Sequence, residues 1–229
     1  GDGHREDSIQ MRTAKASGIT SDDGAGLLSV LLDMRLVPHR NCPFFLSPEW
    51  GTYVFQEEPS YHVLTGTAKA IKQSEAVSGD CFECFEYGEG NVALLLSDGM
   101  GSGDKALKCS SMVVDLLQRF LEAGFSMKAA MRLVNGVLLT GETEHNTSTI
   151  DCCNIDLYQG LCHFCKVGAA PSYLKRDNLV ERISSRNLPL GLVEELGFPD
   201  HPCNPADLVK SLRNGTSISK IMAKSRPKS

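Results

Sequence analysis

The chain has 229 residues, of which 41% are hydrophobic and 22% charged, enough for one well-buried domain with an appendage or for two small domains. With 23 basic and 28 acidic residues its net charge is −5, which argues against a broad nucleic-acid-binding surface and favours a protein or small-molecule partner. The longest apolar run near the N-terminus, Leu27–Val37, is broken by Asp33 and Arg35 and is too short for a bilayer, so we expect no membrane segment.

Residues 1–60 contain few signals of regular structure, and one of them is a turn or helix-start signal at Ser21–Gly24. Spacing of apolar residues predicts a short helix over Gly26–Leu36, with Leu27, Val30 or Leu31, and Met34 on its buried face. Four prolines then interrupt the segment at positions 38, 43, 48 and 59. We interpret residues 1–60 as a regulatory or linker segment.

A strand over Tyr61–Lys72 is expected to lead into a β-hairpin. The hairpin has strands at Cys81–Tyr87 and Val92–Leu96 around the turn Gly88–Asn91. If the turn is centred on Glu89, Asp80 and Asp98 each lie nine residues from its centre. Antiparallel pairing therefore predicts that the two carboxylates meet at the open end of the hairpin.

Two facing carboxylates favour a bound cation, because like charges across a strand pair are destabilising. Each carboxylate has a glycine beside it, Gly79 or Gly99, so backbone can approach a bound ion and a carbonyl can join as a ligand. Ligation by oxygen alone suits Mg²⁺ or Mn²⁺ and not zinc. The alternative is structural: Asp98 in a turn after a buried strand, and Asp80 as a cap.

A glycine-rich run, Gly99–Gly103, precedes a predicted helix and could instead cradle a phosphate. A Walker-type loop ends in Gly-Lys-Ser/Thr, whereas this chain has Gly103-Asp104-Lys105, which places an acid where backbone amides would meet phosphate. Nucleotide binding is therefore the weaker interpretation.

Two helices should follow the hairpin. The first covers Lys105–Ala123, with Asp104 as N-cap and Gly124 as the residue that ends it, and the second covers Met127–Thr140. The residues expected to be buried are Leu107, Val114, Leu117 and Leu121 in the first, and Ala130, Val134, Val137 and Leu138 in the second.

Strand-like runs make up the next part of the chain. They are Ser148–Tyr158, Leu161–Val167, Ser172–Arg176 and Leu179–Ser184. A hairpin, two helices and then antiparallel strands favour an α+β sandwich over a parallel sheet.

The nine cysteines are an odd number, and no secretory signal opens the sequence, so we expect reduced thiols and a cytoplasmic location. Cys81/Cys84 and Cys162/Cys165 have the spacing of zinc ligands. Because residues i and i+3 of a strand point to opposite faces, we expect neither pair to bind zinc.

Several of these motifs, in this order, resemble the metal-dependent serine/threonine phosphatases of the PP2C (PPM) type. More narrowly, the chain resembles the phosphatase domain of the bacterial stage II sporulation protein E, from about Tyr61 to about Leu192. The motifs are Thr65-Gly66, Ser78-Gly79-Asp80 with Ser97–Gly103, Ser148–Asp151, Lys166–Ser172, and Asn187–Gly191. The resemblance implies a helix-sheet-sheet-helix sandwich, which we assign to residues 61–197.

The resemblance also implies a chemistry. In the family two divalent ions, Mn²⁺ or Mg²⁺, share a water that attacks phosphorus. Carried over by motif, Asp98 would bridge both ions, Asp80 would bind one, and the Gly99 carbonyl would complete that second site. The substrate class that the resemblance implies is a phosphoserine regulatory protein. In the sporulation-type relatives it is an anti-anti-sigma factor, and those relatives are anchored through upstream membrane helices.

The chain departs from the family pattern after Gly197. Two later metal-binding aspartates of the family have no counterpart here, and neither Asp200 nor Asp207 ends an apolar strand run. From Leu208 to Ser229 the chain has six basic residues and no acidic one. We therefore expect residues 198–229 to be an atypical basic tail, a solvated or frayed helix, and the sandwich to be incomplete, with an unpaired sheet edge.

Two functions remain open at this point. The first is a PP2C-type protein serine phosphatase, and the second is a catalytically incomplete module that binds a phosphoprotein or has a regulatory role. A homodimer is a further expectation.

Overall fold

The computed structural model describes residues 6–15, 18–69, 78–101, 103–140, 147–176, 179–185, 187–194, 196, 201–203, 208–214 and 217–225. The chain forms two compact units, Gly1–Pro59 and Ser60–Ser229. No helix among these residues combines the length and the apolarity needed to cross a membrane.

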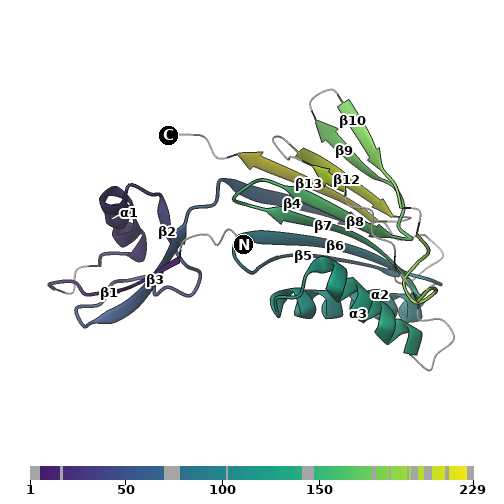
Figure 1. Cartoon of the computed structure of the whole chain (residues 1–229), viewed down its shortest axis with the longest axis horizontal. Helices are drawn as coiled ribbons and strands as arrows, with labels where there is room; N and C mark the ends of the chain where they lie inside the picture. Colours follow the sequence, from purple (N-terminus) through teal and green to yellow (C-terminus); the bar gives the residue numbers. More distant parts are fainter. Residues whose placement is uncertain are drawn as a thin grey trace. The chain divides into compact units, whose positions relative to one another are not determined.

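The first unit is a small α+β fold. Its antiparallel sheet has the order β1-β3-β2, formed by β1 (Glu6–Met11), β2 (Leu36–Pro38) and β3 (Gly51–Glu57), with helix α1 (Ser21–Leu32) beside it (Figure 1). The side chains buried in its core are Ala25, Leu36, Tyr53 and Phe55. Residues 6–59 therefore include a folded core and are not only a linker, and a regulatory role for them stays a prediction.

Helix α1 begins five residues earlier than predicted, because Thr20 caps it. The Asp23 amide donates to Thr20 Oγ1 over 3.1 Å, and the Thr20 amide donates to Asp23 Oδ2 over 2.8 Å. This is a capping box, and its hydrogen bonds from the Thr20 amide and hydroxyl hold the pKa of Asp23 below its usual value.

The face of α1 that we predicted to be buried is exposed. Leu27, Val30 and Leu31 are 64%, 81% and 70% exposed, whereas Gly24 and Ala25 are buried. A Cβ added to Gly24 would lie 3.5 Å from Leu46 and 3.7 Å from Phe55, at ordinary van der Waals distances, so this side of the helix faces the core of the unit.

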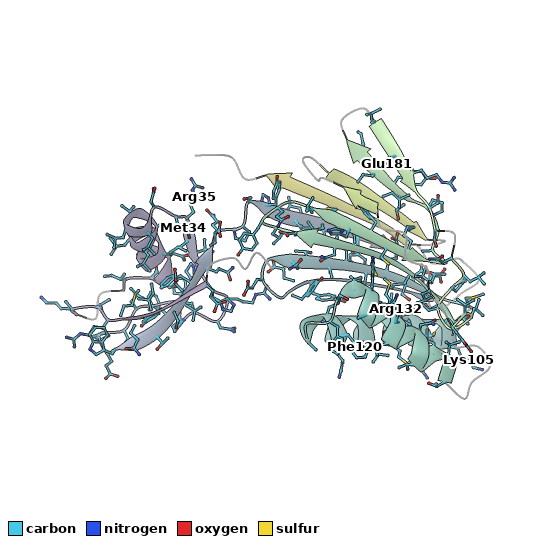
Figure 2. All side chains as sticks on the ribbon, in the orientation of Figure 1. Met34, Arg35, Lys105, Phe120, Arg132 and Glu181 are labelled. Atoms are coloured by element: carbon cyan, nitrogen blue, oxygen red, sulfur yellow. The ribbon has the colours of Figure 1, made fainter. Side chains whose placement is uncertain are left out.

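The polypeptide that leaves α1 makes one apolar and one ionic contact within the first unit. Met34 packs against the edge of the core, and Arg35 forms an ion pair with Glu58 of 3.5 Å (Figure 2).

The described residues of the second unit form two five-stranded antiparallel sheets and two helices. One sheet has the order β11-β8-β7-β6-β5 and the other β10-β9-β12-β13-β4. The elements are β4 (Tyr61–Lys69), β5 (Asp80–Tyr87), β6 (Asn91–Gly99), α2 (Gly103–Glu122), α3 (Met127–Thr140), β7 (Ser148–Asp156), β8 (Cys162–Val167), β9 (Ser172–Arg176), β10 (Leu179–Ile183), β11 (His201–Cys203), β12 (Leu208–Asn214) and β13 (Ser217–Ser225). The α+β sandwich is confirmed.

Figure 1 shows α2 and α3 on the outer face of the sheet that contains β5 and β6, with the second sheet on its other face. Both described helices of this unit thus cover the same sheet. Strand β6 is buried on both faces, which explains its continuous apolar run. Ala93 and Leu95 face the helices, while Leu94 and Leu96 belong to the core between the sheets.

The two helices of this unit lie close to where the sequence placed them. α3 has the predicted bounds, although Val137 is 42% exposed and not buried. α2 begins at Gly103, so Asp104 lies in its first turn and is not the N-cap. Gly124 ends α2 as predicted, with φ of 87°, and the following Phe125 contacts Phe120 edge to face (Figure 2).

The cysteine pairs point to opposite faces of their strands, as predicted. Cys81 packs against the helix-side core and Cys84 against the core between the sheets. Cys162 and Cys165 divide in the same way. Cys42, Cys84 and Cys109 are free thiols, and burial raises the pKa of Cys84.

The predicted unpaired sheet edge and the predicted helical tail are both wrong, because the basic tail supplies two strands. β12 pairs with β9, and β13 lies between β12 and β4. The signal that we overlooked is Asn214-Gly215, a dipeptide typical of tight hairpin turns, between two runs of mixed apolar and polar residues.

Helix α2 approaches the sheet closely at two glycines. A Cβ on Gly99 would lie 2.0 Å from the Ala106 carbonyl oxygen, and one on Gly79 would lie 2.9 Å from Ala106 Cβ. Ser110 on the same helix donates to the Gly79 carbonyl over 2.5 Å. The first turns of α2 therefore rest directly on the ends of β5 and β6.

We predict that a chain ending at residue 207 loses cooperative thermal unfolding, because β9 and β4 would both lose a hydrogen-bonded neighbour. Circular dichroism during heating measures this. A chain ending at residue 225 keeps β13 and should melt like the full chain. An unchanged melting curve for the shorter chain would show that β12 and β13 add nothing to the sheet.

We also predict that Gly99→Ala destabilises the protein by about 1–3 kcal/mol, because the added methyl group overlaps the backbone of α2. Urea unfolding measures the change. The matched control is Gly136→Ala on α3, which has open space around it and should stabilise the protein by roughly 0.5–1 kcal/mol. Equal effects of the two variants would contradict the close packing at Gly99.

Candidate metal centre

The open end of the β5–β6 hairpin brings Asp80 and Asp98 together. They are direct partners in the antiparallel register, with Asp80 at the first position of β5 and Asp98 next to the end of β6. Asp80 is only 5% exposed, and Asp98 is half-buried. The predicted placement of these two residues at the same open end of the hairpin is confirmed.

Strand alternation places the carboxylates and their glycines on opposite sides of the sheet. Asp98 is two residues from Leu96, which belongs to the core between the sheets, so its side chain is on that face. Gly99 and Gly79 are on the other face, against α2. The helix thus supports the backbone of the site from behind, while the acidic groups are directed between the sheets.

Hydroxyl groups fix the backbone around Asp98. Ser97 Oγ and Ser148 Oγ lie 2.7 Å apart, and Ser148 Oγ donates to the Asp98 carbonyl over 2.9 Å. Both serines are fully buried. Ser78 Oγ donates to Asp80 Oδ2 over 3.2 Å, so the second carboxylate is also oriented by a neighbouring hydroxyl.

One polar atom beside the carboxylates has no hydrogen-bond partner among the described residues. It is Thr149 Oγ1, which is buried, and Thr149 is the direct neighbour of Asp98 on β7. A row of Asp80, Asp98 and Thr149 therefore offers oxygen atoms on one face of three adjacent strands. This set fits a hard cation such as Mg²⁺ or Mn²⁺.

The described residues supply only part of the ligands of a two-ion site. They contain no group of three or more His, Cys, Asp or Glu that could hold a metal. The substitutes considered from the sequence, Asp200 and Asp207, lie outside the described residues. The roles of Asp80, Asp98 and the Gly99 carbonyl as metal ligands stay predictions.

Sequence reasoning missed the contribution of α2 to this centre. Ala106 and Ser110 contact the glycines that flank the carboxylates, and neither residue belongs to a motif that we singled out. The only available signal was the small size of both side chains, close behind the glycine-rich run.

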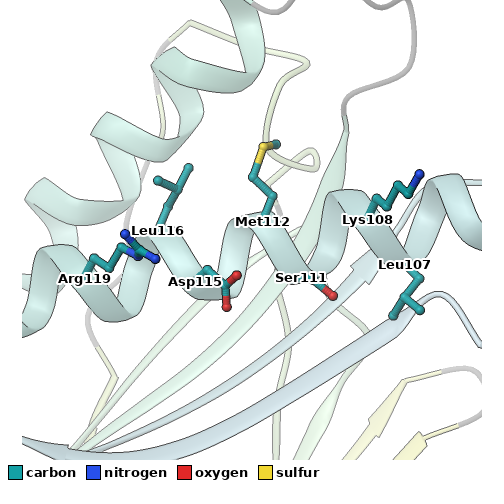
Figure 3. A pocket seen from close by; sticks show the side chains of 7 residues that line it. All are labelled: Leu107, Lys108, Ser111, Met112, Asp115, Leu116 and Arg119. Atoms are coloured by element: carbon teal, nitrogen blue, oxygen red, sulfur yellow. The ribbon is translucent and has the colours of Figure 1, made fainter.

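A hollow of about 520 Å³ lies along α2, apart from the carboxylates (Figure 3). The seven residues that line it all project from this one helix, and they are Leu107, Lys108, Ser111, Met112, Asp115, Leu116 and Arg119. Neither Asp80 nor Asp98 is among them, so this hollow is not the candidate metal centre.

Comparison with known proteins places the chain. The sequence model of the family "Stage II sporulation protein E (SpoIIE)" matches residues 88–207. Stage II sporulation protein E of Bacillus subtilis (strain 168) is 39% identical over 178 residues, which cover 75% of this chain and 21% of that protein. The chain therefore spans about a fifth of the length of this curated relative.

Solved structures show the same fold. The PP2C phosphatase domain of Bacillus subtilis SpoIIE, with a fragment of its regulatory domain, has a TM-score of 0.72 at 23% identity, covering 100% of this chain and 81% of that one. RsbX in complex with magnesium has a TM-score of 0.57 at 14% identity, covering 74% of this chain and 98% of that one. The chain belongs to the stage II sporulation protein E family and has the PP2C phosphatase fold.

Proposed function

We propose that this chain is a metal-dependent protein serine phosphatase module of the sporulation type. The observation that carries the proposal is the direct opposition of Asp80 and Asp98 at the end of β5 and β6. Two carboxylates held side by side repel each other unless a cation or a proton lies between them. Membership of the SpoIIE family gives this arrangement a function, the hydrolysis of a phosphate ester.

The residues at this centre would hold Mn²⁺ or Mg²⁺, with Asp98 and Asp80 as carboxylate ligands and the Gly99 carbonyl as a third oxygen. Such an ion, when bound, lowers the pKa of a water and offsets charge on phosphoryl oxygens. Ser148 holds the Asp98 backbone, and α2 supports Gly99. The magnesium complex of the structural relative RsbX favours the same class of ion.

The substrate that we propose is a phosphoserine regulatory protein of the anti-anti-sigma factor class, encountered in the cytoplasm. The net charge of −5 makes nucleic acid an unsuitable partner. For the first unit we propose a regulatory role, because the SpoIIE structure that covers the whole chain includes a fragment of a regulatory domain. A homodimer remains a further proposal.

A second function is favoured by the small number of acidic ligands among the described residues. With two carboxylates the centre could hold one ion, or none, and the chain would then bind a phosphoprotein or act in regulation without turnover. Metal titration separates this function from the first.

We predict that the purified chain binds Mn²⁺ in a calorimetric titration and hydrolyses p-nitrophenyl phosphate only when Mn²⁺ is present. Asp98→Asn should abolish hydrolysis and weaken Mn²⁺ binding at least about tenfold, because it removes a charged carboxylate ligand of the bound ion. Asp115→Asn is the control, since Asp115 is an exposed acid on α2 away from the centre and its replacement should change neither quantity.

Metal binding and hydrolysis, measured together, distinguish the two functions. Binding of Mn²⁺ with hydrolysis supports the phosphatase. A folded chain that binds one ion or none and hydrolyses nothing supports the binding module. Hydrolysis that survives in Asp98→Asn would remove the carboxylate pair from the mechanism.

A further inference from the structure

A buried cluster of polar side chains lies behind the carboxylate pair. Lys166 Nζ is 2.6 Å from Asp151 Oδ2 and 2.7 Å from Ser172 Oγ, and Ser172 Oγ donates to the same carboxylate oxygen. The three residues are between 0% and 4% exposed. Each group contacts the other two, so the cluster is a closed triangle with no direct access from solvent.

The position of this triangle relates it to the metal centre. Asp98 is opposite Thr149 on β7, and Asp151 is two residues further along the same strand. Residues two apart share a sheet face and are separated by about 7 Å along the strand. Asp151 and its partner on β8, Lys166, thus occupy the next row behind Asp80, Asp98 and Thr149.

The triangle also connects the two sheets. Asp151 and Lys166 belong to the sheet that carries Asp80 and Asp98, whereas Ser172 is the first residue of β9 in the other sheet. The connection between β8 and β9 contacts β7 beside the carboxylates, since Gly168 forms a bridge with Ile150, the residue that follows Thr149. Contacts within the triangle therefore set where β9 begins over the carboxylate end of the sandwich.

Stability alone does not account for such a cluster. Removing two charges from water costs about as much as their attraction returns, and apolar side chains of similar volume often serve equally well. Three contacts that share one carboxylate oxygen do fix the distance between the two sheets, because the contacts are short and directional. Apolar packing would fill the same space without defining that separation.

We infer that Lys166, Asp151 and Ser172 form a positioning unit that fixes the spacing of the two sheets behind the Asp80–Asp98 centre, and thereby its affinity for a divalent ion. This inference rests on the proposed function, because it concerns the same centre. The three side chains hold the second sheet in place and contact no reacting group.

The test replaces the whole triangle, since removing a single charged partner would leave the other charge buried and unpaired. In the full chain, Lys166→Met, Asp151→Val and Ser172→Ala are combined. We expect the variant to melt near the temperature of the unaltered protein, but its dissociation constant for Mn²⁺, measured by calorimetry, should rise about tenfold.

The matched control is Val92→Ala. Val92 lies on the same sheet face at the turn end of β6, far along the strand from Asp98, and is 3% exposed. This variant should melt at a lower temperature and bind Mn²⁺ with unchanged affinity. If its affinity falls as much as that of the triple variant, the effect is general loosening and the positioning role is overturned.

The remaining outcomes are distinct. If the unaltered chain binds Mn²⁺ and the triple variant binds it equally well, the inference fails while the proposed function stands. If the folded, unaltered chain binds no Mn²⁺, both fail together. Should the triple variant not fold, Ser172→Ala alone keeps the ion pair and releases β9, and an unchanged Mn²⁺ affinity in that variant would overturn the inference.

Discussion

The antiparallel pairing of β5 with β6 is the constraint on which the candidate centre depends. Its register makes Asp80 and Asp98 direct neighbours at a sheet end, an arrangement that is unfavourable without a neutralising group. The rest of the unit holds this arrangement in place. Strand β6 is buried on both faces, and α2 rests on the glycines beside both carboxylates, so neither strand can slip to relieve the repulsion.

The two faces of this sheet have separate tasks. On the helix side, small residues such as Gly79, Gly99 and Ala106 allow backbone to approach backbone. On the side between the sheets, acidic and hydroxyl groups are arranged in rows, with Asp98 and Thr149 in the outer row and Asp151 and Lys166 behind it. A strand period of two is sufficient to keep these sets apart, so one short hairpin can serve both packing and chemistry.

Local patterns in the sequence were enough to predict the hairpin, α3 and the opposite orientation of the cysteine pairs, because each depends on residues close together in the chain. The buried face of α1 was predicted wrongly because we followed the helical spacing of Leu27 and Leu31, whereas the residues that the fold buries are Gly24 and Ala25. The strands of the tail were missed because we gave weight to its basic charge and overlooked the hairpin signal between β12 and β13, and their other partners, β9 and β4, are distant in sequence. The contact of Lys166 with Ser172 requires two sheets to stack, and no single motif contains that information.

The late position of β12 and β13 in the chain has a consequence for how the protein folds during synthesis. In the described sheet, β4 is an edge strand whose single neighbour is β13. Lys69 of β4 therefore cannot form its backbone pairing until Ser217 of β13 has been synthesised. A ribosome synthesises the hairpin, both helices and the first sheet before that partner exists. During this interval β4 presents open backbone groups to the cell, and folding of the sandwich should be slow and sensitive to chaperones, in keeping with contacts of such long sequence separation.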